Sequence, residues 1–95
     1  IFEDSVPIRA EVSGGCSFLG LDPLYLANEG KFLCILPEAY AEEALALMRS
    51  DPLGRDAARI GEVRADHPGK VVLETPLGST RLMDMLEGEQ LPRIC

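Results

Sequence analysis

The sequence predicts an α+β domain, with helices packed on one face of a mixed or antiparallel sheet. In the first half, two helix-like segments flank an apolar run of strand length, and in the second half turn signals separate short strands. The length of 95 residues suits one compact domain. With three Phe, two Tyr and no Trp, the core is expected to be mostly aliphatic.

The first predicted helix has Ser5 as its N-cap and Pro7 in its first turn. Gly14 and Gly15 weaken it, and close backbone contact on the packed face is the expected reason. Gly20 is expected to end the helix in the left-handed conformation. The apolar residues that recur at helical spacing are Ile8, Val12, Cys16 and Leu19.

The rest of the fold is predicted from an apolar run, a second helix and a series of turns. Residues 31–36 are apolar enough to form a strand buried on both faces. The second helix begins at Pro37-Glu38 and stops at Asp51-Pro52, because a residue that precedes proline avoids the helical region. A β-meander is expected to follow, with strands at 58–64, 70–75 and 79–83 and turns at 66–69 and 76–78.

Charge and composition exclude several classes of function. The formal net charge is −7 and the pI about 4.5, which argues against binding to nucleic acid or to an anionic membrane surface. No apolar run approaches the roughly 18 residues of a membrane span, and no signal peptide is visible, so the expected location is the cytoplasm. Because the sequence begins without Met, we expect a piece of a longer protein.

The last eight residues differ in character from residues 1–87, which we assign to the α+β domain. Residues 88–95 show no regular period and Pro92 prevents a continuing helix, so a flexible arm of roughly 23 Å is expected. Cys95 ends the arm, either as an incidental thiol or as a covalent carrier that accepts a group at one site and presents it at another. The adjacent α-carboxylate is expected to raise the pKa of Cys95, and Arg93 would offset this effect.

The other chemically capable residues each have a plain structural interpretation. Cys16 and Cys34 lie on predicted apolar faces and are expected in the core; without a CxxC motif, no metal site is predicted. Glu29 is either a solvated turn carboxylate or, in a cleft, a general base. His67 is expected to be a turn residue, and the loop Gly54-Arg55-Asp56 has no phosphate-binding pattern.

Four segments carry a resemblance to a known family. They are Val6-Pro7-Ile8-Arg9, Leu19 to Lys31, Pro52 to Ala58, and Gly88 to Cys95. These segments resemble the C-terminal domain of HypE-type carbamoyl dehydratases, which act in [NiFe]-hydrogenase maturation. The closing Pro-Arg-Ile-Cys is the most specific part. The wider superfamily, which lacks the terminal cysteine, includes aminoimidazole ribonucleotide synthetase, selenophosphate synthetase and thiamine-monophosphate kinase.

The resemblance implies a function that neither spacing nor composition shows. A HypF-type carbamoyltransferase would load a carbamoyl group on Cys95, and ATP-dependent dehydration would convert it to a thiocyanate. The cyano group would then pass to iron on a HypC–HypD scaffold. Glu29 matches the family's acidic base, and substrate positioning would fall to its neighbours and to the arm, namely Asn28, Gly30, Pro92 and Arg93.

The resemblance also sets what this chain should lack. ATP and Mg²⁺ would bind mainly to an N-terminal domain, which also forms a homodimer and is absent from this sequence. We therefore expect the chain alone to be inactive. Two alternatives stay open: a non-catalytic α+β interaction or regulatory module, and the equivalent domain of a related ATP-dependent synthetase or kinase.

Overall fold

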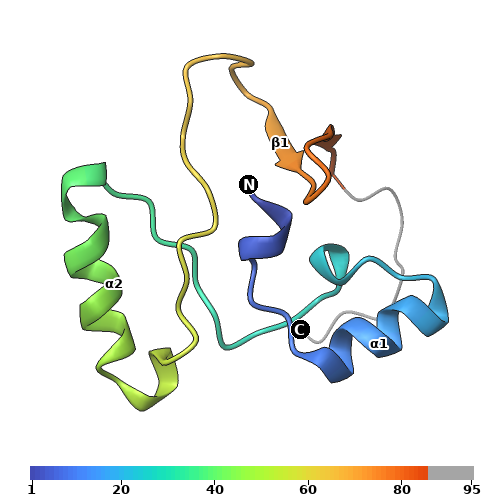
Figure 1. Ribbon diagram of the computed structural model, residues 1–95, viewed down its shortest axis with the longest axis horizontal. Coiled ribbons are helices and arrows are strands. Elements are labelled where there is room, and N and C mark those ends of the chain that lie inside the picture. The colour runs from blue at the N-terminus through green and yellow to red at the C-terminus, as the bar shows by residue number, and fades with distance from the viewer. Residues whose placement is uncertain (86–95) are drawn as a thin grey trace. The chain divides into compact units, whose positions relative to one another are not determined.

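The computed structural model describes residues 1–85, which contain two α-helices and one two-stranded antiparallel sheet (Figure 1). These residues form two compact units. One unit joins Ile1–Pro7 to Ile35–Asp84, and the other contains Ile8–Cys34. The α+β class predicted from the sequence is confirmed. No helix within the described part of the chain is long and apolar enough to cross a membrane.

Helix α1 spans Ala10–Leu19 and begins later than predicted. Ser5 is not its N-cap; it ends a 3-10 turn, Glu3–Ser5. The residue before Pro7 is held in an extended conformation, and the backbone of Arg9 is also extended, so the helix starts only after both. Gly20 closes the helix as predicted, with φ 70°, and the amide of the next residue bonds the carbonyl of Cys16 at 2.8 Å.

Helix α2 spans Ala41–Arg49 and follows a 3-10 turn at Glu38–Tyr40, close to the predicted start. The helix ends before Asp51-Pro52, as predicted. The Arg49 side chain donates from Nε to the carbonyl oxygen of Ala57 at 2.9 Å, and this bond holds the following loop against the end of the helix. The predicted end of α2 is therefore confirmed.

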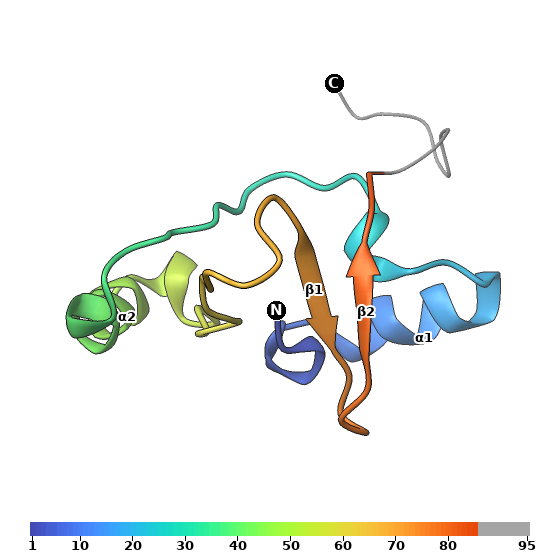
Figure 2. The same cartoon turned by 90° about the horizontal axis from the view of Figure 1, so that it is seen from above.

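The sheet pairs β1 (Val71–Glu74) with β2 (Thr80–Met83), in register from Val71↔Met83 to Glu74↔Thr80 (Figure 2). In the connecting turn, Thr75 and Ser79 share a backbone hydrogen bond of 2.8 Å and a hydroxyl–hydroxyl contact of 2.6 Å. Gly78 adopts φ 83°, which favours glycine. The last two predicted strands are thus confirmed, each shorter by one or two residues.

The other two predicted strands, at residues 31–36 and 58–64, are wrong. Residues 31–36 form no strand, and Phe32, Leu33 and Ile35 expose 79%, 67% and 72% of their surfaces. Residues 58–64 are also outside any strand, although Ile60 accepts a backbone hydrogen bond. A strand needs a neighbour for its backbone groups, and within residues 1–85 neither segment has a full one.

The first two residues extend the sheet beyond β1. Phe2 forms a parallel bridge with Glu74, whose amide donates to the carbonyl of Ile1 at 2.8 Å. On the opposite side, the Phe2 amide donates to the carbonyl of Ile60 at 2.8 Å. The short segment Ile1–Phe2 therefore lies between β1 and the extended residues around Ile60, all within one compact unit.

Burial is sparse in the described residues. Leu73 is fully buried at the centre of β1, and Cys16 is 5% exposed on α1. Many large apolar side chains are instead open to solvent, among them Phe18, Leu47, Leu53, Val63 and Leu77. In place of the predicted aliphatic core, each unit has one buried apolar residue among residues 1–85.

Candidate active-site turn

The predicted site lies in the unit that contains α1, after the helix has ended. A 3-10 turn, Pro23–Tyr25, follows Gly20 and is capped by Asp22, whose Oδ1 accepts from the amide of Leu24 at 2.9 Å. The Tyr25 amide donates to the carbonyl of Asp22 at 3.0 Å. Pro23 fixes the backbone inside the turn, and Asp22 accepts a hydrogen bond from the first free amide of the turn. Local residues therefore set the conformation of the chain just before residue 28.

The Asn28-Glu29-Gly30 turn is organised by its outer residues. Asn28 donates from Nδ2 to the carbonyl of Leu26 at 2.8 Å and so folds its side chain back on the preceding backbone. Gly30 has φ 79°, a conformation that a residue with a Cβ rarely adopts. Glu29 is consequently at the tip of the turn, and all three residues are exposed.

The Glu29 carboxylate is chemically free within the described part of the chain. Among residues 1–85, no hydrogen bond or ion pair engages it. A carboxylate in this state can accept a proton from a group brought to it. Its role as a base stays a prediction.

The remaining predicted site residues, Pro92, Arg93 and Cys95, lie outside the described residues. The structure therefore places the Asn28-Glu29-Gly30 half of the predicted site and not the half on the arm. Whether Glu29 meets Cys95 stays a prediction.

The other two cysteines have different outcomes. Cys16 is buried, and its predicted packing role is confirmed. Cys34 is exposed, so its predicted place in the core is wrong for this chain. The reason is the missing strand: residues 31–36 were expected to be covered on both faces of a sheet, and no described neighbour covers them.

His67 is a turn residue, as predicted, with φ 54°. Its Nε2 lies 3.9 Å from an oxygen of Asp66, and Asp66 also lies 3.3 Å from Arg64. All three side chains are more than half exposed, so these contacts are weak. Within residues 1–85, no group of three or more His, Cys, Asp or Glu side chains could hold a metal ion.

One ion pair was not visible from spacing. Arg59 donates to Glu38 at 2.9 Å, across 21 residues of sequence. This hydrogen bond, together with the charge of Glu38, raises the pKa of Arg59 above its ordinary value. The pair joins the 3-10 turn before α2 to the segment after the Gly54 loop, and the only signal for it in the sequence was the presence of opposite charges.

The fold and the turn define a class of protein. The chain is an α+β domain that presents an exposed acidic turn after its first helix, and residues 1–74 match the family model "AIR synthase related protein, C-terminal domain". The chain belongs to this family of AIR synthase related C-terminal domains.

Proteins of similar sequence include hydrogenase maturation factors. Carbamoyl dehydratase HypE of Azotobacter vinelandii is 54% identical over all 95 residues, and so is that of Rhodobacter capsulatus. The chain spans 28% of the length of either relative. The resemblance found in the sequence is confirmed.

Solved structures share this fold. A crystal structure of hydrogenase maturation protein HypE matches with a TM-score of 0.89 and 61% identity. The match covers all of this chain and 32% of the chain in that structure. A HypE structure in complex with ATP matches with a TM-score of 0.88 at 59% identity. This match covers all of the present chain and 30% of the chain in that structure. A structure of a HypE–HypF complex matches with a TM-score of 0.82 at 40% identity. This match covers 88% of the present chain and 27% of the matched chain in the complex.

Proposed function

We propose that this chain is the part of an ATP-dependent carbamoyl dehydratase that carries the substrate and the catalytic base. The observation that supports this most directly is the 54% identity to carbamoyl dehydratase HypE across the full 95 residues. In the longer protein, Cys95 carries a carbamoyl group, and dehydration converts the resulting thiocarboxamide to a thiocyanate. The product supplies cyanide ligands for the iron of a [NiFe]-hydrogenase.

The chemistry assigns separate tasks to the thiol and to the turn. As a thiolate, Cys95 attacks the carbon of an activated carbamoyl group held by the carbamoyltransferase. The S–C bond forms as the bond from that carbon to its activating oxygen breaks and the activating group leaves, and the resulting thioester-like bond holds the carbamoyl group during later steps. Because a nitrile has no N–H, both amide protons must leave. Glu29 accepts one proton from the carbamoyl nitrogen as the amide oxygen takes the phosphoryl group, and the other leaves with the departing phosphate when the C–O bond breaks. Its exposed, unpaired carboxylate in the described chain supports this role, because the base is open to an incoming group.

Positioning falls to the residues around these two groups. Asn28 and Gly30 set the turn that projects Glu29, through the Asn28 hydrogen bond at 2.8 Å and the φ of 79° at Gly30. Pro92 and Arg93 set the approach of the arm, and Arg93 stabilises the thiolate of Cys95. Residues 1–87 form the domain and residues 88–95 the arm in this proposal.

Nucleotide chemistry belongs to the rest of the longer protein. ATP supplies a phosphoryl group that makes the amide oxygen a good leaving group, and the HypE structure in complex with ATP supports this requirement. We expect ATP and Mg²⁺ to bind mainly to the N-terminal domain.

The proposed partners follow the path of the carbamoyl group. A HypF-type carbamoyltransferase loads Cys95, and the HypE–HypF complex supports this partner. A HypC–HypD scaffold receives the cyano group, and the full-length protein is a homodimer. The reaction takes place in the cytoplasm, where thiols such as Cys95 stay reduced.

Carrier function is tested by intact-protein mass spectrometry of the full-length protein. Carbamoyltransferase with carbamoyl phosphate should add one carbamoyl group, and ATP should then remove one water. Cys95→Ala should accept no carbamoyl group, whereas Cys34→Ala, at the exposed cysteine, should be loaded normally. Equal loading of Cys95→Ala would remove the carrier assignment.

The role of Glu29 is tested at the second step. Glu29→Gln keeps the shape of the side chain but cannot accept the proton, so it should load normally and dehydrate at least ~100-fold more slowly, the contribution typical of a general base. Glu38→Gln, at another exposed glutamate, is the control and should dehydrate at the normal rate. Normal dehydration by Glu29→Gln would contradict its assignment as the base.

A further inference from the structure

The turn that holds Glu29 also holds a cation. Lys31 follows Glu29 by two residues, and both side chains are exposed. Among residues 1–85, no hydrogen bond or ion pair engages the Lys31 ammonium, and it does not pair with the Glu29 carboxylate. Gly30, with φ 79°, turns the backbone between the two residues. Two opposite charges are therefore presented from one turn, each open to an incoming group.

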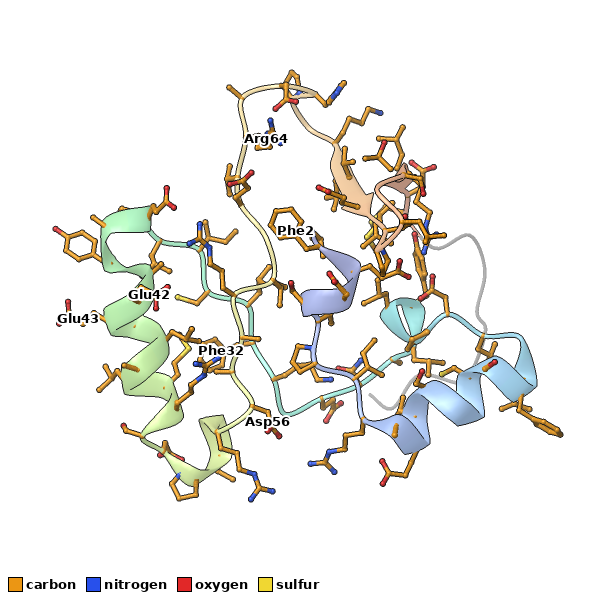
Figure 3. All side chains as sticks on the ribbon, viewed as in Figure 1. Phe2, Phe32, Glu42, Glu43, Asp56 and Arg64 are labelled. Carbon is orange, nitrogen blue, oxygen red and sulfur yellow. The ribbon has the colours of Figure 1, made fainter. Side chains whose placement is uncertain are left out.

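Covalent geometry keeps these two residues close together. Consecutive Cα atoms are about 3.8 Å apart, so the Cα atoms of Glu29 and Lys31 are at most about 7.6 Å apart. A lysine ammonium stands on a flexible four-carbon stem and can turn towards a group that is bound at the glutamate. Phe32 continues the chain in a segment without helix or strand, with 79% of its surface exposed (Figure 3). Lys31 thus lies on an exposed loop, where its side chain can meet a bound group.

Positive charge is scarce in this part of the sequence. Between Arg9 and Arg49, Lys31 is the only basic residue, whereas the same stretch carries six acidic residues. The only other lysine of the sequence, Lys70, lies in the other compact unit. An anion brought to the turn would therefore find its positive charge at Lys31.

The proposed dehydration brings such an anion to the base. Once the carbamoyl oxygen carries a phosphoryl group, that group has about two negative charges. Nitrogen and phosphorus are separated in this adduct by one carbon and one oxygen. Glu29, itself an anion, therefore reaches the nitrogen within a few ångströms of a second anion, and like charges at this distance repel. A positive group on the same turn offsets the repulsion.

We propose that Lys31 binds the phosphoryl group on the carbamoyl oxygen and stabilises its departure, while Glu29 acts on the carbamoyl nitrogen. The ligand class is a phosphorylated thiocarbamate, S–C(=NH)–O–PO₃²⁻, carried on Cys95. A lysine ammonium suits this ligand, because it is a compact charge and lysine is a common phosphate ligand in proteins. This role rests on the proposed function, which it extends from the nitrogen to the oxygen of the same group.

The assisted step is the cleavage of the C–O bond. As this bond breaks, its electron pair goes to the phosphate oxygen. The remaining N–H proton passes to the phosphate, and the electron pair of the N–H bond becomes the third bond of the nitrile. The products are the thiocyanate and hydrogen phosphate. Lys31 keeps its proton throughout and balances the charge that builds up on the leaving oxygen.

Single-turnover dehydration of the full-length, carbamoylated protein tests this role. Lys31→Met keeps a similar length and removes the charge. It should be loaded normally and dehydrate at least ~100-fold more slowly at saturating ATP, the usual effect of removing one group that stabilises charge in the transition state. The ATP concentration that gives half of the maximal rate should not change, because the contact acts on the departing group and not on free ATP.

Two further variants serve as controls. Lys31→Arg keeps the positive charge and should recover most of the lost rate, whereas Lys70→Met, at the other exposed lysine, should dehydrate normally. Normal dehydration by Lys31→Met would overturn the proposal, and so would an equally large loss in Lys31→Arg. A higher ATP requirement at an unchanged maximal rate would also overturn it, because Lys31 would then bind ATP and not the departing phosphate.

Binding of the leaving group gives a readout apart from turnover. Inorganic phosphate is titrated by calorimetry into the dehydrated full-length protein, with ADP and Mg²⁺ present to keep the nucleotide site filled. Lys31→Met should bind phosphate at least ~10-fold more weakly than the unsubstituted protein, because a charge-assisted hydrogen bond is lost. The absence of any difference between the two proteins would contradict the contact.

The unsubstituted protein, measured in the same assays, separates this role from the proposed function. If it is not carbamoylated or not dehydrated, the proposed function fails. If it is both, and Lys31→Met behaves in the same way, only the role of Lys31 fails.

Discussion

Gly54 is the residue whose side chain, were there one, would do most harm. A Cβ at Gly54 would overlap the carbonyl oxygen of Met48, in the last turn of α2. That carbonyl is backbone and also accepts the amide of Asp51 at 3.2 Å, so it has little freedom to move. The sequence motif Gly54-Arg55-Asp56 is thus explained in part by packing at its first residue.

Gly54→Ala should lower the free energy of unfolding of the full-length protein by about 1–3 kcal/mol, the usual cost of overpacking. Urea denaturation followed by circular dichroism measures this difference. The control is Gly14→Ala, where no atom lies within 4 Å of the added Cβ and where alanine favours the helix by up to about 1 kcal/mol. Similar losses at both positions would contradict the packing explanation.

At the same scale, the turn that carries Asn28, Glu29 and Gly30 was predictable from the sequence. The Asn-Glu-Gly turn has local causes, a side-chain hydrogen bond and a left-handed glycine, and local causes are written in neighbouring residues. The Arg59–Glu38 pair joins distant positions, and Cys34 is exposed because residues 31–36 form no strand within residues 1–85. The sequence indicated the chemistry available to each side chain, but it did not indicate which residues that side chain contacts in the fold.

Among the elements, two turns with the same sequence have the same structure. Asp22-Pro23-Leu24 and Asp51-Pro52-Leu53 each begin a 3-10 turn, and in each the aspartate Oδ1 accepts from the amide two residues on, at 2.9 and 2.8 Å. Proline supplies the fixed φ and aspartate the cap. The motif acts as a reusable stop after a helix.

Asp51→Ala should cost about 0.5–2 kcal/mol in the free energy of unfolding, because the amide of Leu53 loses its acceptor. Asp51→Asn keeps an acceptor oxygen in the same place and should lose much less. Thermal denaturation of the full-length protein compares the two variants. If Asn were as harmful as Ala, the charge of Asp51 and not its hydrogen bond would be the stabilising feature.

Elements with local signals were predicted better than elements that depend on partners. The end of α1 at Gly20, the end of α2 and the hairpin β1–β2 were all predicted to within two residues. The start of α1 was missed because the effect of Pro7 on its predecessor outweighed the capping preference of Ser5. Residues 31–36 have the composition of a buried strand, but composition does not supply the neighbouring strand.

At the scale of the whole molecule, the described residues expose more apolar surface than a self-sufficient domain would. Leu53 and Leu77 are 99% and 95% exposed, and Phe18 on α1 is 89% exposed. Small domains fold alone only when they bury most of such surface. The chain, which spans 28% of its curated relatives, is expected to depend on the rest of the longer protein.

Chain 1–95 alone should therefore bind the dye 1-anilinonaphthalene-8-sulfonate and raise its fluorescence several-fold more than the full-length protein does at equal concentration. It should also hydrolyse no ATP. Fluorescence titration and a phosphate-release assay measure the two properties. Dye binding no stronger than that of the full-length protein would show that the chain covers its apolar surface without help.

The pairing of Ile1 has a practical consequence for anyone who expresses this region. A peptide bond before Ile1 would present a neutral N–H to the Val72 carbonyl, whereas a chain cut there presents a positive ammonium group inside the sheet. A piece intended for NMR or for partner binding should begin upstream of Ile1, so that a neutral peptide N–H faces the Val72 carbonyl.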